Sequence, residues 1–121
     1  MIDLHCHILP GIDDGADTWE ESMEMARISV AGGVKTAIAT PHYSRDLSPE
    51  LVKKLVNEFN ERLSDANISL NVMPGMEIYL DPAIPNLLKT GHLQTIRDKY
   101  LLIELPMNHL PLYTDEVLFK L

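Results

Sequence analysis

The chain opens with residues 1–15, MIDLHCHILPGIDDG, which combine a short strand with a group of metal-binding side chains. Ile2–His5 is predicted to be a strand, in which residues i and i+2 project to one face. His5 and His7 should therefore lie on one side while Cys6 points away. The Gly-flanked turn that carries Asp13 and Asp14 then returns to the same end of the strand. This arrangement predicts a metal site at that end.

The length and composition are those of a globular protein with a single domain spanning 1–121. The chain has 121 residues, 45% of them hydrophobic, and a formal net charge of −8. Such an acidic chain has no electrostatic footprint for nucleic acid or for an anionic membrane. An anionic substrate would therefore need a local positive charge, which bound metal could supply.

Cysteine content and hydropathy indicate the compartment. A single cysteine permits no internal disulfide, which favours a reducing, cytoplasmic location. No apolar run reaches the roughly 18 residues that a membrane span needs, so no membrane insertion is expected. Asp3, His5 and His7 interrupt any apolar region of a signal peptide.

The remaining chain reads as alternating strands and helices. Thr18 with Glu21 forms a capping box that starts a helix, which Gly32 and Gly33 end, and Ser48-Pro49 starts a second helix. The predicted apolar stripe of this second helix comprises Leu51, Leu55, Phe59 and Leu63. Further strands are predicted over 34–40, 68–73 and 100–105, and helices over 81–89 and 113–121. This order predicts an α/β fold of four parallel strands with right-handed crossovers, open or curved toward a barrel.

Residues of metal-ligand type stand at the end of each predicted strand. His5 and His7 follow the first strand, His42 the second and Glu77 the third, while Glu104 lies within the fourth. Functional sites of parallel α/β folds gather at the carboxyl ends of the strands. Nitrogen and oxygen donors without thiolate suit Mn²⁺, Fe or Zn²⁺, and a shared carboxylate suggests more than one ion.

Several of these residues also have structural interpretations. Asp13 and Asp14 are natural turn formers beside Gly15. His42 could be a loop residue, and Glu77 a solvated turn carboxylate. An unpaired carboxylate inside an apolar run is costly, which favours a ligand role for Glu104.

The last predicted helix lacks the usual termination signals. It reaches Leu121 without a Gly, a Pro or a polar tail, and Val117, Leu118 and Phe119 lack an obvious partner. A fourth strand left at an open edge would be a pairing hazard. These features predict that the chain is the first part of a protein about twice as long.

The opening block resembles the PHP (polymerase and histidinol phosphatase) superfamily. More narrowly, it resembles the manganese-dependent tyrosine-protein phosphatases of bacterial capsule and exopolysaccharide operons, the CpsB/CapC type. The resemblance continues through ATPHY at 39–43, PGMEI at 74–78 and KYLLIELP at 99–106.

The resemblance implies the N-terminal half of a distorted seven-stranded α/β barrel with a three-metal site. His5, His7 and Glu77 would hold the first ion, Glu77 and Glu104 the second, and Asp14 and His42 the third. Asp13 would replace Asp14 if the turn register differs by one. The implied cofactor is manganese, with iron or zinc as alternatives, and the family's remaining ligands would lie beyond Leu121.

The implied activity is hydrolysis of phosphotyrosine in a protein, with a bacterial tyrosine kinase of capsule synthesis as the substrate. The residue six positions after Cys6 is Ile12 rather than Arg, which excludes the Cys-x5-Arg mechanism for this thiol. Cys6 is expected to be a small buried packing residue. Two alternatives remain: a phosphatase for a small molecule such as histidinol phosphate, and an inactive half-barrel. A half-barrel would assemble with a partner or self-associate through its open edge.

Overall fold

All residues from 1 to 121 are described in a computed structural model with mixed α/β architecture. The strands β1 (Ile2–Cys6), β2 (Thr36–Ala39) and β3 (Asn71–Pro74) form one sheet in that order. The strands β4 (Glu77–Tyr79) and β5 (Leu102–Glu104) form a second pair. Every pairing between these strands is parallel, as predicted, and an isolated parallel bridge from His42 to Glu77 links the two sheets.

The first two predicted helix starts are confirmed. Helix α1 (Trp19–Ala31) follows Thr18, whose hydroxyl accepts the Glu21 amide at 3.2 Å. The Glu21 carboxylate accepts the amide of Asp17 rather than that of Thr18, one residue earlier than the predicted capping box requires. Helix α2 (Pro49–Asp65) follows Ser48, whose hydroxyl accepts the Leu51 amide at 3.1 Å.

The buried face of α2 differs from the predicted stripe. After Pro49 in the first turn, the buried residues are Val52, Val56, Phe59 and Leu63, whereas Leu51 is 38% exposed. Repeated steps of four residues drift around a helix of 3.6 residues per turn, while alternating steps of four and three stay on one face. The stripe that begins at Val52 follows that alternation, which explains why it packs against the sheet.

The chain between β3 and β5 also departs from prediction. The sequence predicts one strand over 68–73, but β3 begins only at Asn71 and a separate short strand, β4, starts at Glu77. Between them, Gly75 lies close to the core: a Cβ there would sit 3.0 Å from side-chain atoms of both Ile38 and Ile96. Helices α3 (Ile84–Lys89) and α4 (Thr114–Phe119) and strand β5 are shorter than predicted.

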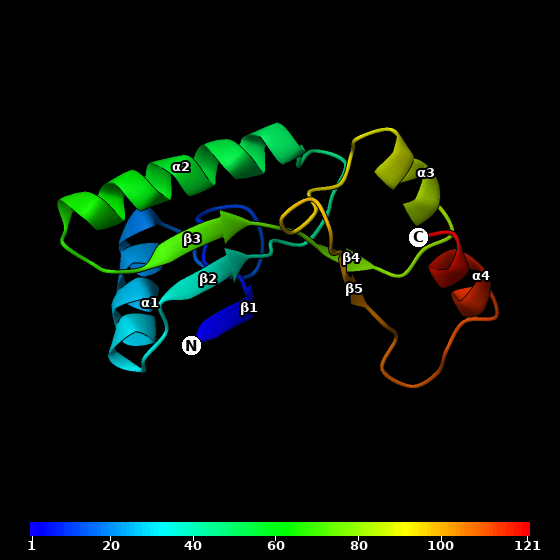
Figure 1. Cartoon of the computed structure of the whole chain (residues 1–121), viewed down its shortest axis with the longest axis horizontal. Coiled ribbons are helices and arrows are strands. Elements are labelled where there is room, and N and C mark those ends of the chain that lie inside the picture. The colour runs from blue at the N-terminus through cyan, green and yellow to red at the C-terminus, as the bar shows by residue number, and fades with distance from the viewer.

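The helices and sheets are arranged in two neighbouring groups. Figure 1 shows α1 and α2 beside the β1–β3 sheet, and α3 and α4 beside the β4–β5 pair. One apolar cluster runs through both groups and includes Phe59, Leu63, Ile78, Leu80 and Ile84, all exposed by 2% or less. None of the helices combines the length and the apolar character that crossing a bilayer requires.

Candidate metal centre

The carboxylate of Glu77 lies at the centre of the predicted site. Its side chain is only 8% exposed, and its Oε2 atom lies 2.9 Å from Nε2 of both His5 and His7. The same oxygen lies 3.5 Å from Nδ1 of His42. A buried carboxylate is costly unless it is compensated. The convergence of three imidazoles on one oxygen supplies that compensation, and a cation would supply it more fully.

The strands bring these groups together. His5 lies in β1 and His7 directly follows it, while Glu77 is the first residue of β4. The His42–Glu77 bridge, with the Tyr43 amide donating to the Glu77 carbonyl at 2.9 Å, holds the segment after β2 against β4. Residues that are distant in sequence therefore meet at one edge, which we call the rim.

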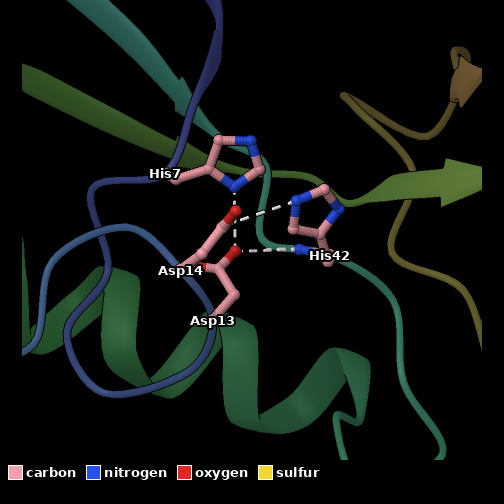
Figure 2. Close-up of side chains that lie close together, drawn as sticks. All are labelled: His7, Asp13, Asp14 and His42. Carbon is pink, nitrogen blue, oxygen red and sulfur yellow. Dashed lines mark hydrogen bonds and ion pairs between the residues drawn. The ribbon is translucent and has the colours of Figure 1, made fainter.

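Asp13 lies beneath the rim histidines. Its Oδ2 atom is 2.8 Å from Nδ1 of His7 and accepts the backbone N–H of His42 at 3.0 Å. Its Oδ1 atom accepts the Gly15 amide at 3.0 Å. Figure 2 shows the Asp13 carboxylate pointing at both histidines, with Asp14 beside it. The turn after β1 is thus tied to the segment after β2 through one side chain.

Asp14 and Glu104 form the exposed margin of the rim. The Asp14 side chain is 79% exposed, and its Oδ1 lies 3.5 Å from Nε2 of His42. The Glu104 side chain is 43% exposed, and its Oε2 lies 4.0 Å from Nδ1 of the same histidine. Both carboxylates therefore have oxygens directed toward His42.

The six predicted ligands and Asp13 fall into three overlapping groups. Within each group, one donor atom per residue lies within 4.8 Å of the others; the groups are His5–His7–Glu77, His42–Glu77–Glu104 and His7–Asp13–Asp14–His42. Every donor is a nitrogen or a carboxylate oxygen, a set that suits Mn²⁺, Fe²⁺ or Zn²⁺. The sharing of Glu77 between two groups is the arrangement expected of a bridging ligand. The donor set at the rim therefore fits a centre with more than one divalent ion.

The electrostatics of the rim favour ionised carboxylates. Burial, the largest single influence, raises the pKa of Glu77, but the hydrogen bond from His5 and the charges of three histidines together lower it below its usual value. Burial likewise raises the pKa of Asp13, yet hydrogen bonds from His7, Gly15 and His42 leave it lowered. Burial lowers the pKa of His7, but the hydrogen bond and charge of Asp13, with Glu77 and Asp14, leave it raised.

Cys6 does not take part in the rim. Its thiol donates to the Ile38 carbonyl at 3.2 Å, and burial, together with the nearby Asp3 charge, raises its pKa to about 12. The group is therefore a thiol rather than a nucleophilic thiolate at neutral pH. This agrees with the expectation that Cys6 is a packing residue.

The sequence interpretation did not anticipate the hydrogen bonds of Asp13. It treated Asp13 as a turn former or as a substitute ligand, whereas this side chain is 7% exposed and makes three short contacts at the rim. No local signal distinguishes Asp13 from Asp14, because both stand in the same turn before Gly15 at nearly the same spacing from His7.

Comparisons with known proteins match most or all of the chain. The family model for capsular polysaccharide synthesis, CpsB/CapC, matches residues 1–117. Tyrosine-protein phosphatase YwqE of Bacillus subtilis (strain 168) is 41% identical over 125 residues, covering 100% of this chain and 49% of the relative. Putative tyrosine-protein phosphatase CapC of Staphylococcus aureus is 34% identical over 127 residues, with coverage of 100% and 49%.

A solved structure gives the same result. It comes from work on YwqE from Bacillus subtilis and CpsB from Streptococcus pneumoniae, described there as unique metal-dependent tyrosine phosphatases. It superposes with a TM-score of 0.91 at 41% identity, covering 97% of this chain and 49% of that one. The chain spans about half the length of the curated relatives it matches.

Proposed function

The chain belongs to the CpsB/CapC family of capsular polysaccharide synthesis proteins, and on that basis we propose that its rim is part of a metal-dependent protein-tyrosine phosphatase site. The observation that carries the proposal is the buried Glu77 carboxylate, on which His5, His7 and His42 converge. The chain spans about half the length of its relatives, so their phosphatase activity is a proposal for this site. The fold we propose is the N-terminal half of a distorted seven-stranded barrel, with residues 1–121 forming one PHP domain.

The proposed ligand roles follow the three groups at the rim. His5, His7 and Glu77 would hold one ion, and Glu77 with Glu104 a second. Asp14 and His42 would hold a third, since the exposed Asp14 oxygen faces Nε2 of His42. We propose manganese as the metal, with iron and zinc compatible with the same donors.

The metal would supply what this acidic chain lacks. Bound divalent ions neutralise charge on a phosphoryl group and lower the pKa of water, which makes a nucleophile available near neutral pH. The chain's own residues contribute position and charge: the lowered pKa of Glu77 keeps it anionic, and it is faced by His5 in β1 and by His7 directly after that strand. Phosphoryl transfer depends mainly on such positioning and charge compensation.

A phosphotyrosine substrate suits a site of this kind. The leaving phenol has a pKa near 10, far below that of an aliphatic alcohol, so departure requires little help from a general acid. Cys6 offers no alternative nucleophile, because its thiol is protonated and directed at the Ile38 carbonyl.

The names of the relatives favour a protein substrate over a small molecule, and we propose a bacterial tyrosine kinase of capsule synthesis as that protein. For the present chain, the single free cysteine favours a cytoplasmic location.

The open edge of β1 bears on whether this chain acts alone. Ile2 and Leu4 are each 61% exposed, and an apolar cavity of about 310 Å³ lies among Leu4, Ile96 and Tyr100 with Leu101 and Leu102. Exposed edges and apolar hollows of this kind favour association. We propose that further barrel strands or a second copy of the chain cover this side.

Turnover of a phosphotyrosine peptide with added Mn²⁺, measured together with solution mass, tests the proposal. Glu77→Gln should abolish Mn²⁺-dependent turnover, while Glu61→Gln on the exposed face of α2 removes the same charge and should leave it unchanged. A chain of 121 residues that binds Mn²⁺ but turns over slowly, and gains activity on association, fits the proposal of a partial barrel. Turnover that is independent of metal, or unaffected by Glu77→Gln, would refute the assignment of the site.

A further inference from the structure

Three nitrogen atoms converge on the carboxylate of Asp13. They are Nδ1 of His7 at 2.8 Å, the His42 amide at 3.0 Å and the Gly15 amide at 3.0 Å. The side chain is 7% exposed, and Figure 2 shows its carboxylate directed at both histidines. Both oxygens of Asp13 are therefore engaged by the protein itself.

These contacts determine which nitrogen of His7 carries hydrogen. An ionised carboxylate can only accept hydrogen bonds, so the short contact to Asp13 requires a hydrogen on Nδ1 of His7. The other ring nitrogen, Nε2, lies 2.9 Å from the Glu77 carboxylate at the rim. In the metal-free chain a hydrogen on Nε2 can bridge to Glu77, and a bound ion would take the place of that hydrogen. Because Nδ1 is held by Asp13, Nε2 is the nitrogen available to an ion.

The same carboxylate also fixes the second histidine. Oδ2 of Asp13 accepts the backbone N–H of His42, so it anchors the residue from which that imidazole projects. The rings of His7 and His42 stack with centroids 4.6 Å apart and an interplanar angle of 27°. A displacement of Asp13 would therefore disturb both rings together.

We propose that Asp13 is a positioning residue for the metal centre rather than one of its ligands. It holds the Nδ1–H of His7, so that Nε2 is the nitrogen that can bind an ion, and it anchors His42 through the backbone. Asp14 is the contrasting neighbour: its side chain is 79% exposed, and an oxygen remains available toward the His42 ring. This inference rests on the proposed metal centre, because Asp13 can position metal ligands only if the rim binds metal.

The test compares zinc binding by the unsubstituted chain, Asp13→Ala, Asp13→Asn and the exposed control Asp46→Asn. Removal of an outer hydrogen-bond partner of a histidine ligand weakens metal binding by about 10–100-fold, which is the loss expected for Asp13→Ala. Asp13→Asn should lose less, because its single amide oxygen can still accept from His7 but cannot serve all three N–H groups. Asp46→Asn should bind zinc as the unsubstituted chain does.

Nitrogen NMR of the zinc-loaded imidazoles separates positioning from a purely structural role. The unsubstituted chain should show His7 with a slowly exchanging Nδ1–H and zinc at Nε2. In Asp13→Ala that proton should exchange rapidly with solvent. If the alanine variant does not fold, Asp13→Asn serves instead, and its Nδ1–H should exchange faster than in the unsubstituted chain. Thermal unfolding without metal reports stability independently.

The outcomes are distinguishable. If the unsubstituted chain does not bind zinc, both the proposed metal centre and the positioning role of Asp13 are refuted. Zinc binding that both Asp13 variants retain in full, or a proton on Nε2 of His7 in the loaded chain, would overturn the positioning role alone.

Discussion

Replacement of Gly15 by alanine should disrupt the rim from a position that has no side chain of its own. An added Cβ would collide with the His7 carbonyl oxygen and would lie 2.6 Å from His7 Cβ and 2.9 Å from its carbonyl carbon. Ordinary contacts between such atoms are about 3.5 Å, so the turn must move away from His7 by roughly 1 Å. That movement would strain the Asp13–His7 hydrogen bond, because the Gly15 amide is held by the same carboxylate.

The size of the effect follows from the contact. Overpacking of this kind typically costs about 1–3 kcal/mol, and for a domain of this length each kcal/mol lowers the thermal midpoint by about 4 °C. We therefore expect Gly15→Ala to lower the midpoint of the metal-free chain by roughly 4–12 °C. Zinc or Mn²⁺ affinity should fall by about tenfold, since the hydrogen bond that orients His7 is strained.

Gly32→Ala is the matched control for this substitution. Its added Cβ would meet the Ser29 and Ile28 carbonyl oxygens at 3.5 and 3.6 Å, which are ordinary contacts. Thermal unfolding and titration calorimetry of both variants make the comparison. A Gly15→Ala chain that melts and binds metal like Gly32→Ala would refute the argument that the turn is packed against His7.

Three further predictions concern separate parts of the chain. Glu77→Gln should reduce the number of bound ions more than Asp14→Asn, because Glu77 is shared by two candidate groups. Elemental analysis of both variants measures the bound metal, and a larger loss in Asp14→Asn would contradict the bridging assignment. Ser48→Ala should destabilise the fold by about 1 kcal/mol through loss of its hydrogen bond from the Leu51 amide, and denaturant unfolding that matches the wild type would contradict this capping role. Cys6 should react slowly with iodoacetamide in the native chain and rapidly in urea, because its thiol is packed against Ile38; equal rates by mass spectrometry would contradict that packing.

Local signals in the sequence predict much of the fold. Thr18 and Ser48 mark helix starts because their hydroxyls accept amides three residues ahead, an interaction confined to a single turn. Strand β4 was missed because nothing local specifies it. Its residues are extended because Glu77 and Ile78 pair with Leu102 and Ile103 of β5, and pairing of this kind depends on the tertiary fold.

The site was predictable to the extent that strand ends converge. The sequence identified His5, His7, His42, Glu77 and Glu104 from their positions along the chain, and the structure brings these side chains together at the rim. The different environments of Asp13 and Asp14 were not predictable, since either residue suits a turn before glycine. Asp13 is buried because the turn folds against the segment after β2, which lies far along the chain.

The central claim is that the rim binds divalent ions around Glu77, and anomalous diffraction from crystals grown with Mn²⁺ tests it most directly. We predict anomalous peaks at the rim, with one ion contacting both Glu77 and the imidazoles of His5 and His7. Crystals of Glu77→Gln grown in the same way should lose that peak. A fully occupied Mn²⁺ site elsewhere on the chain, with no peak beside Glu77 in the unsubstituted protein, would contradict the account.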